Sequence, residues 1–159
     1  MSNFLNTIHI LLADDDKDDN ILFQEVLDEL PLSTHLTTVF NGEQLMQFLN
    51  ETNARLPDVL FLDLNMPRKN GFDCLSEIKR SEKLKLLSVI IFSTSNEPQV
   101  LSLLHKNGAQ YYIRKPNSYT QLKKIIHHAL NLTAKTNIEY PLQEKFVLSD
   151  NFINNNEYK

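Results

Sequence analysis

The chain has 159 residues, of which 42% are hydrophobic and 23% charged, and its formal net charge is -4 at pH 7. This size fits one globular domain with a short appendage, and the composition is that of an ordinary soluble protein. A negative net charge argues against a nucleic-acid-binding surface spread over the whole domain. We therefore expect no nucleic acid among its partners.

Cysteine content and hydropathy indicate a reducing compartment. Cys74 is the only cysteine, so that no intrachain disulfide and no CxxC-type metal site can form. The first residues lack the basic and apolar regions of a signal peptide. No apolar run reaches the roughly 18 residues that a membrane-spanning helix needs. These features predict a cytoplasmic protein with no membrane partner.

Strand and helix patterns alternate along the first 132 residues. Short apolar runs predict strands at residues 8–13, 58–62, 88–92 and 111–114, and a weakly alternating, partly β-branched stretch predicts another at 35–40. Apolar residues at helical spacing predict helices at residues 17–30, around 45–49, around 72–78, from 98 to about 106, and at 119–132. Five strands alternating with five helices indicate parallel strands joined by right-handed crossovers. The expected fold class is α/β, a doubly wound parallel sheet.

Residues 133–159 have a different composition. They contain five asparagines and show no clear helical period. Phe146–Leu148 could form a short strand or a docking segment, but we expect this stretch to be a largely flexible tail. It does not contain the several amphipathic helices that a DNA-binding module requires.

Polar side chains follow four of the predicted strands. They are Asp14 and Asp15 after the first strand, Asp63 after the third, Ser93 and Thr94 after the fourth, and Lys115 after the fifth. In a parallel sheet these strand ends lie at the same edge, so that the side chains can meet. Each alone has an ordinary role, as a helix cap, a turn residue or a solvated lysine. Together they are better explained as one site.

Crowded carboxylates of this kind predict a site for a hard divalent cation, Mg²⁺ or Mn²⁺. Asp15 and Asp63 would be direct ligands, Asp14 would reach the ion directly or through water, and the carbonyl of Asn65 would add a third oxygen. Asp63 could then attack a phosphoryl group and form an acyl phosphate. The metal, Lys115 and a hydroxyl after the fourth strand would stabilise the phosphoryl oxygens.

This set of residues resembles the receiver domain of two-component response regulators. That family has an acidic pair after the first strand, a phosphoacceptor Asp after the third, a Ser or Thr after the fourth and a Lys-Pro after the fifth. Here Asp63 lies 30 residues before Ser93, and Ser93 lies 22 residues before Lys115, as the family's spacing requires. Met66-Pro67 and Gly71 also match the family's loop. The resemblance covers residues 7–132 and implies the flavodoxin-like strand order 2-1-3-4-5, with residues 133–159 as a C-terminal extension.

The resemblance also implies roles for individual residues. Asp63 is the phosphoacceptor, and the spacing favours Ser93 over Thr94 as the hydroxyl that senses the phosphoryl group. Tyr112, rather than Tyr111, corresponds to the aromatic switch residue, because neighbouring strand residues face opposite ways. The Lys115–Pro116 bond is expected to be cis, as in the family.

A stand-alone receiver would accept a phosphoryl group from a sensor histidine kinase or a phosphotransfer protein. It would catalyse only its own phosphotransfer and slow dephosphorylation, and would otherwise not be an enzyme. Phosphorylation would draw Ser93 or Thr94 inward, let Tyr112 turn inward, and change the surface of the fourth helix, fifth strand and fifth helix. That surface would bind a downstream protein and could also form a homodimer. The Ser-Thr-Ser ending and the extension are similar to receivers paired with phytochrome-type kinases.

Two other classes of function fit parts of the pattern. A phosphatase of the haloacid-dehalogenase kind also has an Asp nucleophile after a strand, but it needs a second acid two residues later, where this chain has Asn65. A receiver-like scaffold would bind partners without being phosphorylated. The complete set of expected active-site residues argues against the scaffold.

Overall fold

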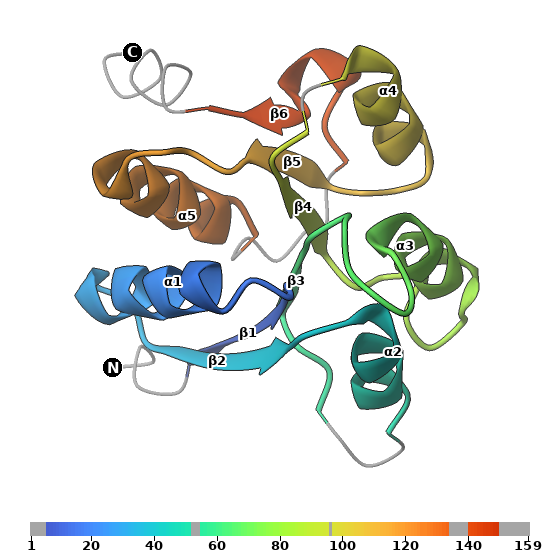
Figure 1. Ribbon diagram of the computed structural model, residues 1–159, viewed down its shortest axis with the longest axis horizontal. Helices are drawn as coiled ribbons and strands as arrows, with labels where there is room; N and C mark the ends of the chain where they lie inside the picture. Colours follow the sequence, from blue (N-terminus) through green and yellow to red (C-terminus); the bar gives the residue numbers. More distant parts are fainter. Residues whose placement is uncertain (1–5, 52–54, 96, 134–139, 150–159) are drawn as a thin grey trace.

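The computed structural model describes residues 6–51, 55–95, 97–133 and 140–149 (Figure 1). The elements, in chain order, are β1 (Ile8–Ala13), α1 (Lys17–Glu29), β2 (Thr34–Val39), α2 (Gly42–Asn50), β3 (Val59–Leu62), α3 (Gly71–Arg80), β4 (Val89–Ser93), α4 (Pro98–Lys106), β5 (Tyr111–Arg114), α5 (Tyr119–Thr133), the short 3-10 helix η2 (Gln143–Lys145) and β6 (Val147–Leu148). The five predicted strands and five predicted helices are all present, with bounds within a few residues of those expected. None of the helices in these ranges is long and apolar enough to cross a membrane.

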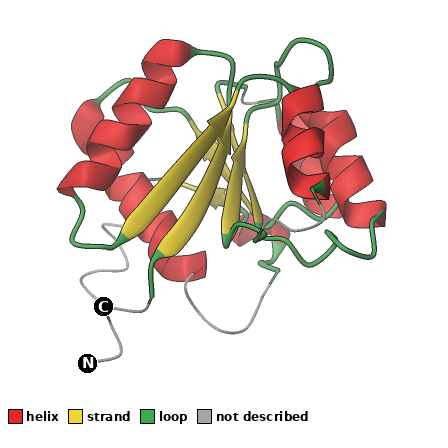
Figure 2. Cartoon of the chain, turned by 90° about the horizontal axis from the view of Figure 1, so that it is seen from below, coloured by secondary structure: helices red, strands yellow, loops and turns green. Residues whose placement is uncertain are grey.

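The strands form one parallel sheet in the order β2-β1-β3-β4-β5-β6. This confirms the doubly wound α/β class and the order 2-1-3-4-5 for the first five strands. The sheet lies between two layers of helices (Figure 2). Helices α1 and α5 cover one face, and α2, α3 and α4 cover the other (Figure 1). All carboxyl ends of the strands therefore point to one edge, as the site prediction requires.

The sheet has a hydrophobic core on each face. Under α1 and α5, the rings of Phe23, Phe61 and Phe92 meet edge to face with centroid separations of 5.0, 5.8 and 6.4 Å. The opposite core packs the other side chains of the same strands, Leu62 and Tyr112 among them, against α2, α3 and α4. Central strands buried on both faces need apolar residues at every position, which explains the uninterrupted runs in the sequence.

Polar residues at the carboxyl edge start the helices that follow the strands. The side chain of Asp16 accepts hydrogen bonds from the backbone N–H groups of Asp18 and Asp19 at the start of α1. Asn41 and Asn70 cap α2 and α3 in the same way. Caps of this kind satisfy backbone donors that the first helical turn leaves free. They hold the helix starts, and so the loops between strand and helix, in place around this edge.

Within residues 140–149 the structure shows a short strand, one of the two alternatives to a flexible tail that the sequence left open at Phe146–Leu148. Phe146 and Leu148 are buried, and β6 pairs with β5 in parallel register, Tyr112 opposite Val147 and Ile113 opposite Leu148. A strand of two residues is too short to give a periodic signal in the sequence, so its partner on β5 decides its conformation. Residues 134–139 and 150–159, which the expectation of a flexible tail also covered, lie outside the described residues.

Lys79, at the end of α3, connects this C-terminal segment to the rest of the domain. Its ammonium group donates to the carbonyls of Lys85 (3.2 Å) and Leu87 (2.9 Å) and to the hydroxyl of Tyr140 (3.3 Å). It also lies 5.5 Å from the centre of the Tyr140 ring, a cation–π contact. Burial lowers the pKa of Lys79 to about 8.

The lowered pKa predicts how stability depends on pH. Between the folded pKa and the ordinary value near 10.5, the unfolded chain binds the proton of Lys79 and the folded chain does not, so that Lys79 makes stability rise with pH. The free energy of unfolding of the wild type, relative to that of Lys79→Met, should therefore increase from about pH 7 to about pH 9.5, below the ordinary pKa of tyrosine. Urea denaturation of the wild type and the variant at each pH measures this difference. Lys85→Met, at a half-exposed lysine, is the matched control. If the free energy of unfolding of the wild type rose equally relative to that of Lys85→Met, the prediction would be contradicted.

Candidate functional site

The carboxylates of Asp14, Asp15 and Asp63 meet at the carboxyl edge of the sheet. One oxygen from each lies within 4.8 Å of the others. Asp14 and Asp63 directly follow the neighbouring strands β1 and β3, and the N–H of Asp63 donates to the carbonyl of Ala13 at 3.0 Å. The strand ladder thus places two acids side by side that lie far apart in the sequence. Asp14 and Asp63 are buried, whereas Asp15 is exposed.

Lys115 reaches into this group of acids from the end of β5. Its Nζ lies 2.7 Å from Oδ2 of Asp14, 2.9 Å from Oδ2 of Asp19 and 3.8 Å from Oδ2 of Asp63. Its backbone N–H donates to the carbonyl of Ser93 at 2.8 Å, which ties the ends of β4 and β5 together. The lysine side chain is only 12% exposed, so that it is a largely buried cation within the site and not a solvated surface lysine.

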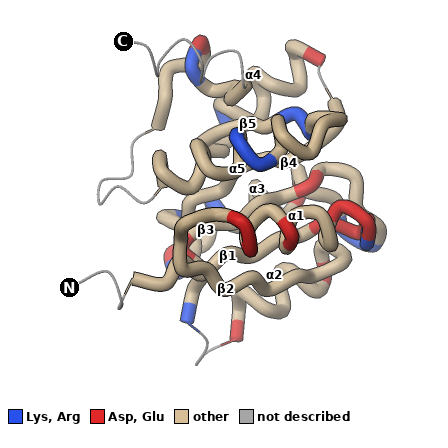
Figure 3. Tube along the Cα trace, turned by 90° about the vertical axis from the view of Figure 1, so that its left-hand side faces the viewer, with Lys and Arg blue, Asp and Glu red and all other residues tan. Residues whose placement is uncertain are grey.

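Asp19 also belongs to the site, although it is not among the residues expected from the strand ends. It lies in the first turn of α1, four residues after Asp15, which precedes the helix. Nothing in the sequence pattern shows that its carboxylate reaches Lys115, because this contact joins residues 96 positions apart. Acidic residues gather along α1 in Figure 3. Asn20, the next residue, is buried and donates from its side chain to the carbonyl of Asp14 at 3.1 Å.

The electrostatics of the site suit a divalent cation. Burial raises the pKa of Asp63 to about 6; nearby Lys115 opposes this shift and nearby Asp14 adds to it. Burial also raises the pKa of Asp14, against the hydrogen bond from Lys115. For Lys115, burial alone would lower the pKa, but hydrogen bonds to Asp14 and Asp19 raise it above its ordinary value. The positive charge of Lys115 is therefore not enough to offset the burial of the two carboxylates. A set of donors made only of oxygen atoms fits Mg²⁺ or Mn²⁺.

The loop after β3 holds Asp63 by a close backbone contact. The N–H of Gly71 donates to the carbonyl of Leu64 at 2.9 Å, and a Cβ at position 71 would lie 2.3 Å from the carbonyl oxygen of Asp63. No side chain fits there. Arg68, in the same loop, has a φ of 69°, a left-handed conformation that is uncommon for residues other than glycine. Asn65 is exposed, next to Asp63.

The two hydroxyl residues after β4 differ in their surroundings. Ser93 is fully buried, and its Oγ accepts from the N–H of Ser95 at 3.4 Å. Thr94 is exposed and lines, together with Lys115, a cavity of about 510 Å³ beside α5. Both residues are near Lys115: the Ser93 carbonyl accepts from its backbone N–H, and Thr94 shares the cavity with it. Of the two hydroxyl residues, Ser93 is therefore the more deeply buried.

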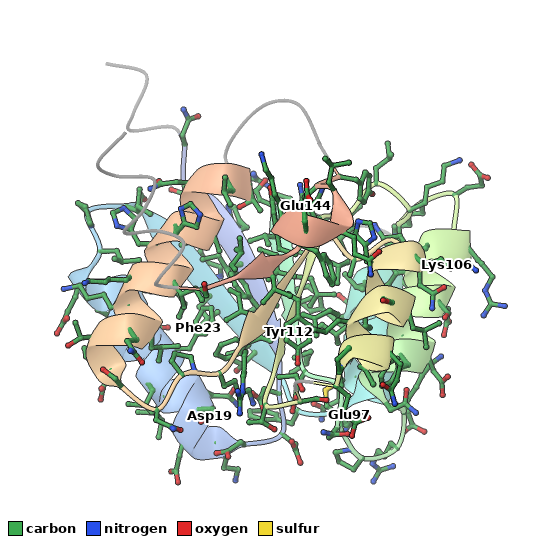
Figure 4. All side chains as sticks on the ribbon, turned by 90° about the horizontal axis from the view of Figure 1, so that it is seen from above. Asp19, Phe23, Glu97, Lys106, Tyr112 and Glu144 are labelled. Carbon is green, nitrogen blue, oxygen red and sulfur yellow. The ribbon has the colours of Figure 1, made fainter. Side chains whose placement is uncertain are left out.

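Tyr112 lies between β5 and α4 (Figure 4). Its phenol donates to the carbonyl of Ser95, and the ring is almost fully buried. Burial raises its pKa, and a hydrogen bond with the Ser93 side chain opposes that shift. Tyr111 packs on the opposite face, against the core under α1 and α5. Of the two tyrosines, therefore, Tyr112 is the one in contact with the loop after β4.

The prediction of a cis bond between Lys115 and Pro116 is wrong, because this bond is trans. Trans is the more stable isomer of an X–Pro bond by about 0.5–1 kcal/mol. Lys115 reaches Asp14 and Asp19 with the trans bond in place.

The fold and the site together define a doubly wound α/β domain with a cluster of carboxylates and a lysine at the carboxyl edge of its sheet. Residues 10–127 match the response regulator receiver domain. The chain therefore belongs to the receiver family of two-component systems, a family of signalling domains.

Relatives and solved structures agree with this family. Response regulator Rcp1 of Synechocystis is 36% identical over 124 residues, which are 74% of this chain and 82% of Rcp1. The Mn(2+)-bound form of Rcp1 superimposes with a TM-score of 0.74 at 29% identity, over 85% of this chain and 99% of that one. The phosphorylated cyanobacterial phytochrome response regulator RcpA gives a TM-score of 0.76 at 31% identity, over 83% and 97%.

Proposed function

We propose that this protein is a single-domain response regulator in which Asp63 accepts a phosphoryl group from a partner histidine kinase or phosphotransfer protein. The observation that carries the proposal is the position of Asp63. It is 6% exposed, directly follows a buried strand and lies 3.8 Å from Lys115 within a group of three carboxylates. The phosphorylated structure of the similar RcpA supports it.

A divalent cation, Mg²⁺ or Mn²⁺, would be held by the carboxylates of Asp14, Asp15 and Asp63 and the carbonyl of Asn65. Support comes from the three carboxylates within 4.8 Å and from the Mn(2+)-bound form of Rcp1. When bound, the cation neutralises charge on the phosphoryl oxygens. Its positive charge would also stabilise the ionised form of Asp63, which burial disfavours.

The residues of this chain would divide the phosphotransfer between them. A carboxylate oxygen of Asp63 forms a bond to phosphorus while the bond from phosphorus to the donor histidine nitrogen breaks, and the electron pair leaves with that nitrogen. Lys115 carries a fixed positive charge beside the carboxylate, where negative charge gathers on the phosphoryl group. Water later hydrolyses the acyl phosphate. Ser93, or else Thr94, would hydrogen-bond a phosphoryl oxygen.

The output would be a change in a protein-binding surface at α4, β5 and α5, transmitted by Tyr112. Here the described C-terminal residues alter the expectation, because η2 and β6 lie over α4 and the edge of β5. Leu103, Leu142 and Val147 are exposed there. A downstream protein or a second copy of this chain would therefore meet α4 together with the C-terminal segment.

The proposal can be tested with a small phosphodonor. Incubation with acetyl phosphate and Mg²⁺ should add one phosphoryl group to the wild type, detected by intact-protein mass spectrometry. Asp63→Asn should carry no adduct. Asp58→Asn, at a half-exposed aspartate that precedes β3 at the opposite edge, should be labelled like the wild type. Steady hydrolysis of assorted phosphate esters would instead indicate a phosphatase, and absence of any adduct on the wild type would indicate a scaffold.

A further inference from the structure

Residues 140–148, here called the C-terminal strap, are attached to the domain along their whole length. Starting at Tyr140 on Lys79, the strap continues with the carbonyl of Pro141, which lies 2.7 Å from Nε2 of His105. The side chain of Gln143 donates to Oγ of Ser102 at 2.6 Å, and β6 completes the strap against β5. Such a series of separate anchors over α4 and β5 indicates a specific docked position.

The most deeply buried residue of the strap, Phe146, lies directly on Tyr112. Phe146 is 1% exposed. Its ring centre is 6.3 Å from that of Tyr112 and 5.1 Å from that of His105 on α4, where the two rings meet edge to face. The backbone N–H of Tyr112 donates to the carbonyl of Phe146 at 3.0 Å. Tyr112 is therefore held by the strap through both its backbone and its ring.

The other end of Tyr112 reaches the site at the carboxyl edge. Its phenol bonds the carbonyl of Ser95 and interacts with the side chain of Ser93. Figure 4 shows Tyr112 between the edge that carries Asp19 and the end of the molecule that carries Glu144 of η2. A single buried side chain thus connects the strap with the loop that would sense the phosphoryl group.

We propose that the strap is part of the switch, with Phe146 as a positioning residue that holds Tyr112 in its inward position and so favours phosphorylation of Asp63. This inference rests on the proposed function and deepens it. The phosphorylation site and the docked strap are coupled through the position of Tyr112. Docking of the strap would favour phosphorylation of Asp63, and phosphorylation of Asp63 would in turn favour the docked position of the strap.

The packing supports this direction of coupling. The inward Tyr112 fills the space beside Phe146, and an outward rotation would remove the phenol from Ser95 and leave one side of the Phe146 ring without contacts. Exposing a buried aromatic ring to water costs free energy, so the packed arrangement is favoured. A coupling free energy must act equally in both directions. The strap and the phosphoryl group can therefore each be used to measure the effect of the other.

The first test measures binding of beryllofluoride, a phosphoryl analogue, to the full-length protein with Mg²⁺. Phe146→Ala should bind it about tenfold more weakly than the wild type, within the usual range of coupling between sites. Val147→Ala, at the adjacent residue, which begins β6 and is partly exposed, is the matched control and should bind normally. Because Phe146→Ala opens a cavity, Phe146→Leu provides a milder second variant, expected to be intermediate. Equal affinity of a folded Phe146 variant and the wild type would overturn the proposal.

The second test follows hydrogen exchange at the backbone N–H of Tyr112, which bonds the strap directly. Beryllofluoride should slow this exchange in the wild type and have a smaller effect in Phe146→Ala. If beryllofluoride binds but leaves the exchange unchanged, the coupling is refuted while the proposed function stands. If the wild type neither binds beryllofluoride nor accepts a phosphoryl group, the proposed function fails, and the inference fails with it.

Discussion

Lys115→Met is expected to destabilise the metal-free protein by about 3 kcal/mol and to slow phosphorylation of Asp63 roughly 100-fold. The lysine is the positive partner of Asp14, which is fully buried, and it also contacts Asp19 and Asp63. Removing one member of a buried ion pair leaves the other charge without compensation. The same substitution removes the fixed positive charge beside the reacting carboxylate.

Urea denaturation without and with Mg²⁺ measures the loss of stability, and the rate of labelling by acetyl phosphate measures the second effect. Adding Asp14→Asn to Lys115→Met should recover most of the stability, because it removes the buried charge that the lysine balanced. Lys123→Met, which breaks an exposed pair with Glu29, should cost well under about 1 kcal/mol. A loss for Lys115→Met no larger than that for Lys123→Met would show that the buried pair is not needed.

Gly71→Ala is expected to destabilise the protein by about 3 kcal/mol and also to impair phosphorylation. The added Cβ would lie 2.3 Å from the carbonyl oxygen of Asp63 and 2.9 Å from Cα of Leu64. These are backbone atoms, so that only movement of the loop after β3 can relieve the clash. Such a movement shifts the backbone that carries Asp63, and small displacements of a reacting group are costly.

Gly108→Ala separates the effect on the fold from that on the site. Gly108 has a φ of 97°, which disfavours a side chain, but an added Cβ would meet only the flexible side chain of Lys79 at 3.2 Å. We expect a loss of about 1–2 kcal/mol from the backbone conformation and a normal labelling rate per folded molecule. For Gly71→Ala and Gly108→Ala, thermal unfolding followed by circular dichroism measures stability, and labelling by acetyl phosphate measures the rate of phosphorylation. Normal labelling of folded Gly71→Ala would contradict the role given to Gly71.

Much of the fold and of the site was predictable, because it depends on local pattern and on strand ends. The apolar run Val59–Leu62 and its counterpart in β4 are buried on both faces, as their lack of polar alternation predicts. A parallel sheet brings every carboxyl end to one edge. For that reason, Asp14, Asp63 and Lys115 could be expected together before any distance was known. The helix ends also followed from local chemistry, such as Asp16 at the start of α1.

The features that escaped prediction depend on contacts between elements that are distant in sequence. Asp19 lies in the first turn of α1, where acidic residues are common, and its bond to Lys115 joins residues 96 positions apart. Phe146 and Leu148 occupy a stretch without periodicity, and their burial depends on an open edge at β5 and on His105 of α4. The contact of Gly71 with the backbone of Asp63 likewise exists only in three dimensions.

The order of β5 and β6 along the chain has a consequence for biosynthesis. In the folded protein β6 covers the edge of β5, and an unpaired edge of exposed backbone groups can recruit strands from other chains. The ribosome makes β5 and α5 before it makes β6, so that a nascent domain carries an open edge at Tyr111–Arg114 until residues 147–148 emerge. Crowded nascent chains are most open to strand exchange during that interval.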